Sequence, residues 1–340
     1  MTDAWDQRAT EADWSAVVEL ARSTPSPLLL AHVSPDGDAL GSALAVGLAL
    51  RELGNAPMVS FGDDPFVVPR ILQFLPGQEL LVAPADVPQQ TPVVFTFDAS
   101  SAGRLGIHQE RAENAEALVV VDHHASYTGF GTHHLVEPDS PATAVMALKL
   151  IDRLGVRLNQ AMATCIYTGL ITDTGSFRYA ATTPHVHEVA ARLMATGIKH
   201  DAIARQLYDT APFGFVRVLG AALDRAVLET DAVGGLGMVW TTVPVSDRVT
   251  AGIGIDSVES VIDAVRVAQE AEVAVVLKEH EDGTYRVSMR SRGHIDVAQV
   301  NIALGGGGHR YAAGYTATCD LDTAMANIRA ALAAAPHLQG

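Results

Sequence analysis

Residues 28–42 read LLLAHVSPDGDALGS, and this stretch decides the fold. An apolar run over Pro27–Ala31 ends in polar and turn-forming residues, and the Ala- and Leu-rich segment Ala39–Leu53 follows it. A short, nearly continuous apolar run is typical of a strand buried on both faces, and a segment rich in Ala and Leu is typical of a helix. The stretch therefore predicts a strand, a turn and a helix in succession.

The same pattern recurs along the first half of the chain. Further apolar runs, each ending in a turn or polar signal, cover Pro57–Phe61, Thr91–Phe97 and Ala117–Val121. Further helices are expected at 12–22, 141–154, 160–171 and, as one or two helices, 184–208. Ser140 and Pro141 suit the N-cap and the first position of the helix at 141–154. Apolar strands that alternate with helices predict an α/β fold with a doubly wound, mainly parallel sheet.

The chain changes character after about residue 209. Two strand-like segments, Val273–Leu277 and Tyr285–Met289, flank the hairpin turn signal Glu281-Asp282-Gly283. With 340 residues, the chain is long enough for two domains that each bury a core. We therefore expect a first domain over 1–195, a linker over 196–220 and a smaller α/β C-terminal domain over 221–340.

Composition and charge exclude several classes of protein. Apolar residues make up 48% of the chain and charged residues 18%, which is too apolar for a disordered protein. A net charge of −16 repels long polyanions unless metals or a local basic patch compensate. The longest apolar run, Ala43–Leu50, is too short to cross a bilayer, so no membrane association is expected. Two distant cysteines, Cys165 and Cys319, fit a reducing, cytoplasmic environment.

Three of the expected strands end in residue types that bind metals. The strand ends are followed by His32, Asp36 and Asp38, by Asp98 (VVFTFDAS, residues 93–100), and by Asp122, His123 and His124 (LVVVDHHAS, residues 118–126). A fourth segment, GLITDTGSF (residues 169–177), places Asp173 at the expected end of a helix. In open α/β sheets, sites form in the crevice outside the carboxyl ends of the strands, so these side chains are expected to converge.

Each of these residues also has a purely structural explanation. Asp36 can form a turn or cap a helix, and Asp98 can be a turn residue. A single histidine such as His32 is more often a hydrogen-bonded residue of the core than a ligand. The pair His133-His134 follows no expected strand and has no flanking acid, so we place it on the surface or in a loop. The alternative is a doubly wound protein with incidental acids, and it requires all these explanations to hold together.

The acids also suggest how many metals the site holds. Asp36, Asp38, Asp98 and Asp173 bring four negative charges, which two divalent cations balance. Without metal, converging carboxylates repel one another and their pKa values rise. Mixed carboxylate and imidazole ligands suit manganese, iron or zinc better than magnesium, which favours oxygen ligands alone.

Together these motifs resemble the signatures of a known family. HVSPDGDALGS, the strand-end Asp98, VDHHAS and GLITDTGSF resemble the four motifs of the DHH phosphoesterases, and residues 290–314 (RSRGHIDVAQVNIALGGGGHRYAAG) resemble the DHH-associated C-terminal domain with its GGGH signature. The resemblance covers nearly the whole chain in the right order. The overall size is similar to the short bacterial oligoribonuclease/pAp phosphatase (nano-RNase) branch, whose actinobacterial members also cleave linear or cyclic dinucleotides.

The resemblance implies a role for each residue of the first domain. It implies two Mn²⁺ ions, with Mg²⁺ or Co²⁺ as substitutes. The implied ligands are His32 and Asp36 for one metal, Asp38, His123 and Asp173 for the other, and Asp98 as a bridge between both. Asp122 would support a histidine from behind by hydrogen bonding, and His124 would face the substrate phosphate. The implied catalytic group is Asp98, Asp122, His123 and His124.

The second domain carries the candidate substrate-binding residues. A run of glycines, Gly305–Gly308, lets the backbone approach an anion closely, although a bare glycine run is otherwise a flexible turn. The residues that the resemblance assigns to the substrate are Arg290, Ser291, Gly306, Gly307, Gly308 and His309. The guanidinium of Arg290 can bind a phosphate bidentately. Arg104 of the first domain either orients the loop of Asp98 or reaches a phosphate, and the structural role is favoured.

The implied function is the hydrolysis of short RNA or DNA oligonucleotides, pAp, and linear or cyclic dinucleotides to mononucleotides, by a cytoplasmic homodimer. The first domain would be catalytic and the second would bind substrate. Alternatives within the superfamily are a manganese inorganic pyrophosphatase and a single-strand exonuclease of the RecJ type. A catalytically silent, nucleotide-sensing binding module is the alternative of another class.

Overall fold

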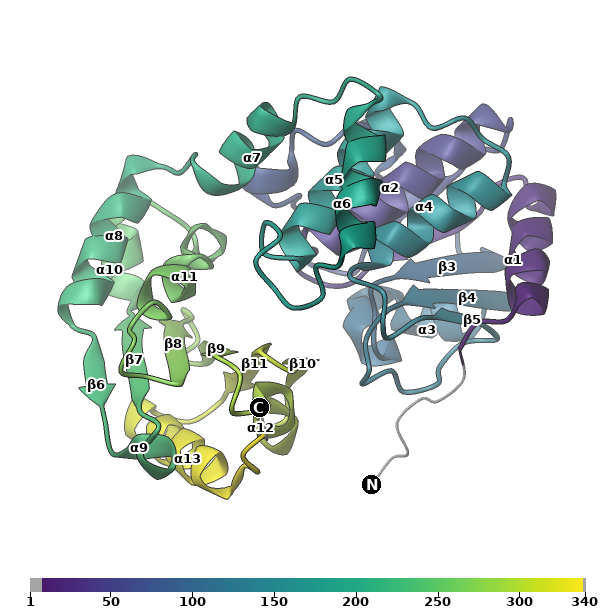
Figure 1. The fold of residues 1–340 in the computed structure, drawn as a ribbon. Coiled ribbons are helices and arrows are strands. Elements are labelled where there is room, and N and C mark those ends of the chain that lie inside the picture. The colour runs from purple at the N-terminus through teal and green to yellow at the C-terminus, as the bar shows by residue number, and fades with distance from the viewer. Residues whose placement is uncertain (1–7, 339–340) are drawn as a thin grey trace. The chain divides into compact units, whose positions relative to one another are not determined.

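Five parallel strands form the centre of the N-terminal unit, in the order β2-β1-β3-β4-β5. They are β1 (Leu28–Ala31), β2 (Met58–Phe61), β3 (Val93–Phe97), β4 (Ala117–Asp122) and β5 (His133–Val136). Figure 1 shows three of them, β3, β4 and β5, next to one another. This computed structural model describes residues 8–338, and the chain divides into two compact units between Thr210 and Ala211.

Helices cover both faces of this sheet. They are α1 (Glu11–Ser23), α2 (Gly37–Glu52), α3 (Gln109–Glu113), α4 (Thr143–Arg153), α5 (Gln160–Asp173), α6 (Pro184–Met194) and α7 (His200–Tyr208), with 3-10 turns η1 (Arg70–Leu72), η2 (Gln78–Leu80), η3 (Pro84–Asp86) and η4 (Ala102–His108). Alternate residues of β3 divide between the faces, because Phe95 and Phe97 pack with α2, α4 and α5, whereas Val94 packs with η4 and α3. The predicted doubly wound α/β sheet is confirmed.

Two local expectations are wrong. Ser140 does not cap the helix at 141–154, which begins at Thr143 with Ala142 as its N-cap, and the Ser140 hydroxyl donates to the Ala142 carbonyl at 2.9 Å. The pair His133-His134 opens β5 instead of lying in a loop. This strand is short and only half buried at its start, so it gives no clear apolar pattern.

A mixed sheet of six strands forms the C-terminal unit, in the order β10-β11-β9-β8-β7-β6. Its elements are α8 (Phe213–Asp224), β6 (Val227–Glu229), α9 (Ala232–Gly235), β7 (Met238–Val243), α10 (Val245–Ala251), η5 (Ile255–Val258), α11 (Val261–Val265), β8 (Val273–Glu279), β9 (Tyr285–Ser291), α12 (Val297–Ala303), β10 (Gly307–His309), β11 (Ala312–Ala317) and α13 (Leu321–Ala334). The helices α12 and α13 share a core with one face of the sheet, and α8 and α11 share a core with β7 and β8 on the other. Residues 196–220, the expected linker, contain α7 and the first part of α8.

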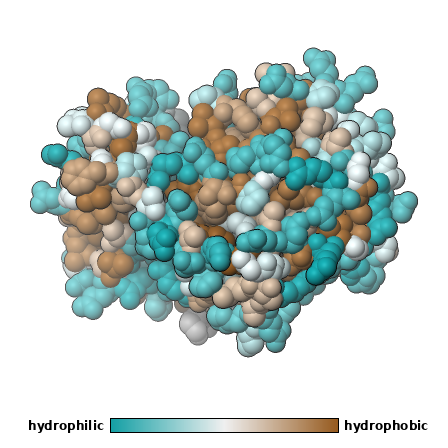
Figure 2. Space-filling view, turned by 90° about the horizontal axis from the view of Figure 1, so that it is seen from above, coloured by the Kyte–Doolittle hydropathy of each residue, from teal (hydrophilic) through white to brown (hydrophobic). Residues whose placement is uncertain are grey.

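The surface is mixed in character. Hydrophilic residues cover much of the face seen in Figure 2, with hydrophobic residues between them. Such mixing is ordinary, since much of the surface of any folded protein is apolar. Within residues 8–338, no helix is both long and apolar enough to span a bilayer.

Candidate metal centre

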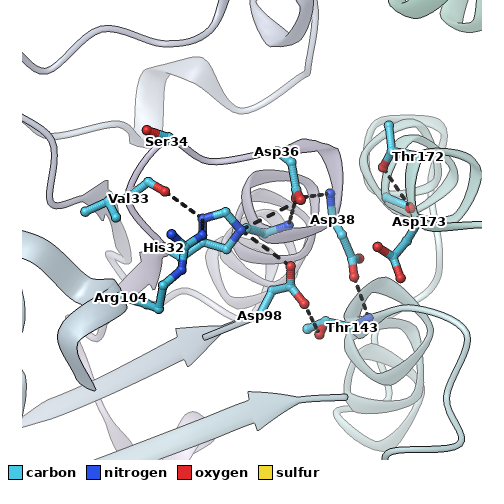
Figure 3. Close-up of polar contacts among 12 residues, drawn as sticks. His32, Val33, Ser34, Asp36, Asp38, Asp98, Arg104, Thr143, Thr172 and Asp173 are labelled. Carbon is cyan, nitrogen blue, oxygen red and sulfur yellow. Dashed lines mark hydrogen bonds and ion pairs between the residues drawn. The ribbon is translucent and has the colours of Figure 1, made fainter. Parts of the chain in front are cut away.

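The predicted ligands gather at the carboxyl ends of the strands in the N-terminal unit. Since β2 and β3 flank β1, the winding of the sheet reverses between β1 and β3. His32 follows β1 and Asp98 follows β3, so both side chains lie at this switch point, where open α/β sheets bind their ligands. In Figure 3, the side chains of His32, Asp36 and Asp98 point toward one another, with Asp38 and Asp173 beside them.

His32 presents one ring nitrogen to the carboxylates. Its Nε2 lies 3.8 Å from Asp36 Oδ2 and 3.6 Å from Asp98 Oδ2. Its Nδ1 lies 2.8 Å from the Val33 carbonyl oxygen and 2.9 Å from Arg104 Nη2. A single ring nitrogen either donates to the carbonyl or accepts from the guanidinium. Donation to Val33 leaves the lone pair of Nε2 directed at the carboxylates, as metal-binding histidines require.

Asp36 uses its two carboxylate oxygens for different purposes. Oδ1 accepts the N–H groups of Asp38 at 2.9 Å and Ala39 at 3.0 Å, and so caps α2. Oδ2 is the atom that faces His32. The helix cap and the ligand position are therefore compatible in one residue.

Asp98 lies between two groups of donor atoms. Its Oδ2 faces His32 Nε2, and its Oδ1 lies 3.4 Å from His123 Nε2. The hydroxyl of Thr143 donates to Oδ1 at 2.9 Å. The backbone of Asp98 has a φ of +61°, an uncommon conformation for a residue other than glycine, and such strain gathers at functional sites. This is the position that a carboxylate bridging two metals requires.

The second group contains Asp38, His123 and Asp173. His123 Nε2 lies 3.9 Å from Asp38 Oδ2 and 3.4 Å from Asp173 Oδ2. Its Nδ1 lies 3.0 Å from the Ser140 carbonyl oxygen, which orients the ring as Val33 orients His32. The donor atoms of this group lie within 4.8 Å of one another, and so do those of His32, Asp36 and Asp98.

The helix α4 holds Asp38 in place. Asp38 is fully buried, and its Oδ2 and Oδ1 accept the N–H groups of Thr143 and Ala144, each at 2.7 Å. These are the first two N–H groups of α4, so a carboxylate from α2 caps a helix that begins a hundred residues later. Thr143 contacts both Asp38 and Asp98, although nothing in the sequence singled it out.

Without a cation, two of the four acids of the cluster resist ionisation and two do not. Burial works against the charged forms of Asp36 and Asp98, but His32 outweighs it at Asp36, and His123 and His32 outweigh it at Asp98, so both pKa values are lowered. Burial raises the pKa of Asp38 well above its ordinary value, and Asp98 and Asp173 raise it further. Burial also raises the pKa of Asp173 to about 7. Burial and Arg104 lower the pKa of His32, but Asp36 and Asp98 outweigh them and raise it to about 9. Protons thus supply the missing positive charge, and the mixed carboxylate and imidazole donors fit divalent transition metals that would displace them.

The pair of Asp122 and His124 lies behind this cluster. His124 Nδ1 lies 2.7 Å from Asp122 Oδ1, and Asp122 is fully buried. Burial lowers the pKa of His124, but Asp122 outweighs it and the net pKa is raised. Asp122 therefore orients the imidazole ring and favours its protonated form. Arg104 contacts His32, and its carbonyl accepts the Val33 N–H at 2.8 Å.

In the C-terminal unit, Arg290 and His309 lie on one face of the sheet. Arg290 of β9 pairs with Ala312 of β11, and Ala312 pairs with His309 of β10. Residues directly opposite one another in antiparallel strands point to the same face, so the guanidinium and the imidazole leave the same face of the sheet, with Ala312 of β11 between them.

Ser291 has a different place from the expected one. It follows Arg290 along the strand and faces the opposite side, where it is buried. Its hydroxyl donates to Glu272 at 2.7 Å and accepts the Gly293 N–H at 3.1 Å. The same Glu272 oxygen also accepts the N–H groups of Arg292, Gly293 and His294. Ser291 thus helps Glu272 hold the loop after β9, and sequence reasoning missed Glu272.

The glycines of the GGGH segment differ in whether a side chain would fit at their position. A Cβ on Gly306 would lie 2.2 Å from the Gly314 carbonyl oxygen, and one on Gly308 would lie 2.6 Å from the Cα of Ala313. Both glycines are therefore required by packing against β11. A Cβ on Gly307 would meet no atom within 4 Å, so this glycine lies on the open side of the strand.

Comparisons with known proteins agree with the motifs. Residues 28–170 match the DHH family, N-terminal domain, and residues 245–335 match the DHHA1 domain. The chain is 35% identical over 315 residues to the bifunctional oligoribonuclease and PAP phosphatase NrnA of Thermus thermophilus, covering 92% of this chain and 91% of that protein. It is 24% identical over 316 residues to the cyclic-di-AMP phosphodiesterase GdpP of Geobacillus thermodenitrificans, covering 86% of this chain and 45% of that protein.

A solved structure shows the same fold. The exopolyphosphatase-related protein from Bacteroides fragilis superposes with a TM-score of 0.84 at 21% identity, covering 95% of this chain and 96% of that one. The first match contains the motifs of His32, Asp98 and His123, and the second contains the glycine segment, whereas Asp173 lies three residues past the end of the first match. From these matches and the geometry of the ligand cluster, the chain is a member of the DHH family of metal-dependent phosphoesterases.

Proposed function

We propose that this protein hydrolyses short oligonucleotides, pAp, and linear or cyclic dinucleotides to mononucleotides, using two manganese ions. The observation that carries the proposal is Asp98, whose two oxygens face separate groups of ligand atoms around His32 and His123. The identity to an oligoribonuclease and PAP phosphatase, over nine tenths of both chains, supports the substrate class.

The proposed metal ligands are His32, Asp36, Asp38, Asp98, His123 and Asp173. Divalent cations bound there would polarise a phosphate and lower the pKa of a water molecule. The protein's own contribution is orientation, since Thr143 and the start of α4 hold Asp38 and Asp98 in place. We assign His124 to the substrate phosphate, because Asp122 keeps its ring oriented and its pKa raised.

The two units would divide the work. We propose residues 1–195 as the catalytic, metal-binding domain and residues 221–340 as the substrate-binding domain, with Arg290 and His309 as its anion-binding groups. We also propose a cytoplasmic homodimer, and light scattering on the purified protein tests the dimer.

A substrate panel tests the function. The panel contains pAp, RNA of about two to five nucleotides, linear and cyclic di-AMP, a long single strand and pyrophosphate. We expect manganese-dependent turnover of the short nucleotides, and loss of turnover after chelation. Turnover of pyrophosphate alone would indicate a pyrophosphatase, and equal turnover of the long strand an exonuclease. Tight binding of nucleotides by the manganese-loaded protein without hydrolysis would indicate a sensing module.

A further inference from the structure

The outer face of α8 carries exposed apolar side chains at helical spacing. Phe213, Val216 and Leu223 are 74%, 55% and 43% exposed, and they follow one another after three and seven residues along the helix. Together with Gly220 they form one line, which we call the α8 stripe. The opposite face of the helix, with Val218, is buried in the core shared with β7 and β8. A surface helix ordinarily turns polar residues to water, so the apolar stripe indicates a face that another surface covers.

Gly220 lies at the centre of the α8 stripe, four residues after Val216 and three before Leu223. A Cβ at this position would meet no atom within 4 Å in the described part of the chain, so packing within the unit does not require the glycine. Glycine inside a helix lowers the stability of the helix relative to alanine. It does allow close approach, because a second helix can pack against the bare backbone without a side chain between them.

Two side chains of opposite charge flank the α8 stripe on one side. Arg217 lies three residues before Gly220 and Asp224 four residues after it, and both are exposed. About 10 Å of helix separates the two, so they do not form an ion pair with each other. Within residues 8–338, neither side chain forms an ion pair or a hydrogen bond. Each is therefore available to a partner of opposite charge.

A second copy of this chain has the features that this face requires. If two α8 helices lie antiparallel about a two-fold axis that passes Gly220, residues before the glycine in one copy lie beside residues after it in the other. Val216 of each copy then meets Leu223 of the other, and Arg217 of each copy meets Asp224 of the other. The apolar contacts and the ion pairs both form twice. This self-complementarity favours a second copy over an unrelated protein, because a two-fold interface joins one patch to itself.

The surface around α8 is large enough to extend this contact. Val249 of α10 is exposed, and so are Val227 and Leu228 of β6, the edge strand of the sheet. α10 packs directly against the start of α8, since a Cβ on Gly214 would lie 2.4 Å from the Ala251 carbonyl oxygen. With the three side chains of the α8 stripe, these residues offer on the order of 500 Å² of apolar surface, which is about the apolar share of one side of a standard interface.

We propose that the α8 stripe is the surface through which two copies of this chain associate, with Gly220 where the two helices cross and with Arg217 of each copy paired to Asp224 of the other. The inference rests on the homodimer of the proposed function and gives that dimer its interface. It needs neither the metals nor the substrate, so it can be tested apart from the hydrolysis.

The first test measures the dimer dissociation constant of the full chain by sedimentation equilibrium. In Gly220→Leu the new side chain has room within its own unit, so the variant should fold, but it obstructs the helix crossing. We expect its Kd to rise about ten- to hundredfold, as for the loss of a central contact in an interface. Val216→Asp should have a similar effect. The matched control is Val67→Asp, because Val67 is 59% exposed and lies in the N-terminal unit.

The second test exchanges the two charges. Arg217→Asp places an acid opposite Asp224 of the other copy, and Asp224→Arg places a base opposite Arg217, so each single variant should raise the Kd. The double variant that carries both changes should return the Kd close to the wild-type value, because both ion pairs form again with their charges reversed. Circular dichroism shows whether each variant folds.

Three results would overturn the interface. They are a monomeric wild-type protein, whose stripe is then covered by the N-terminal unit or by another protein, an unchanged Kd in Gly220→Leu, and a charge exchange that does not restore the dimer. Failure of the proposed function gives a different result, because a wild-type protein that turns over no nucleotide can still form a dimer that Gly220→Leu weakens. Dissociation of the dimer in the stripe variants, with Val67→Asp unchanged, supports the proposal whatever the outcome of the substrate panel.

Discussion

Asp98 combines a strained backbone with a carboxylate that two histidines face from different sides. The strain, on the order of 1–3 kcal/mol, is tolerated because the N–H of Asp98 donates to Val121 at 3.0 Å and Thr143 holds one side-chain oxygen. An asparagine at this position keeps the shape and tolerates the same conformation. It removes the charge that both metals would share.

We therefore expect Asp98→Asn to lower kcat/KM by about 100-fold or more, since changes outside the ligand shell alone cost 10–100-fold. The loss should be at least as large as that of Asp36→Asn, which would weaken one metal only. Steady-state kinetics and elemental analysis of both variants measure this. A near-wild-type rate for Asp98→Asn would refute the bridging role.

His108 shows how a buried histidine is kept neutral outside the site. It has no exposed surface, and Arg111 Nη1 donates to its Nδ1 at 2.8 Å. Its Nε2–H therefore donates to Ser60, whose hydroxyl donates onward to the Val82 carbonyl. Burial and Arg111 lower the pKa of His108 to about 4.

This lowered pKa makes stability depend on pH. Between about pH 6.5 and pH 4 the unfolded chain binds a proton at His108 that the folded protein does not, so the free energy of unfolding falls as the pH falls through this window. In His108→Gln, the amide can replace both hydrogen bonds without titrating. Urea unfolding at pH 7 and pH 5 should show a smaller loss in the variant than in the wild type. Equal losses would contradict this assignment.

Among the elements, α4 depends on a partner from outside its own segment. The first turn of a helix has N–H groups without internal partners, and a nearby serine or aspartate commonly accepts them. Here the acceptor is Asp38 of α2, which also faces His123. The helix and the ligand cluster therefore stabilise each other.

Two alanine variants separate the cap from the charge. In metal-free protein, Asp173→Ala should leave the free energy of unfolding unchanged or raise it, because it removes a buried acid from a group of like charges. Asp38→Ala relieves the same repulsion but leaves two N–H groups of α4 without their acceptor. It should therefore be less stable than Asp173→Ala by about 0.5–2 kcal/mol. Chemical denaturation in the presence of chelator measures the free energy of unfolding of both variants. Equal values would show that the cap from Asp38 does not stabilise α4.

For the molecule as a whole, we expect the net charge to limit the length of the substrate. A net charge of −16 penalises a long polyanion, whereas the two proposed anion-binding groups, Arg290 and His309, would suit a substrate with few phosphates. We expect kcat/KM to be highest for substrates of about two to five nucleotides, because residues 221–338 of the second domain show no evident row of aromatic residues on which successive bases could stack. Competition between a dinucleotide and a long single strand measures the preference. If both are degraded with equal efficiency, the charge argument fails.

The sequence by itself determined four of the five strands in the sheet of the N-terminal unit and the metal-binding residue types at their ends. The four apolar runs became β1 to β4 because strands buried on both faces need apolar side chains at most positions. Parallel strands bring their carboxyl ends to one edge, so residues such as His32 and Asp98 could be expected to meet before any distance was known.

Only the tertiary structure decided which partners these residues have. The N–H groups at the start of α4 are accepted by Asp38, and the Ser291 hydroxyl donates to Glu272. Neither contact could be predicted, because hydrogen-bond partners far apart in the chain leave no local pattern in the sequence. The same holds for Lys278 and Arg286, which become neighbours only through the register of β8 and β9. Local periodicity reports which side of an element is buried, whereas register and packing determine which atoms lie within bonding distance.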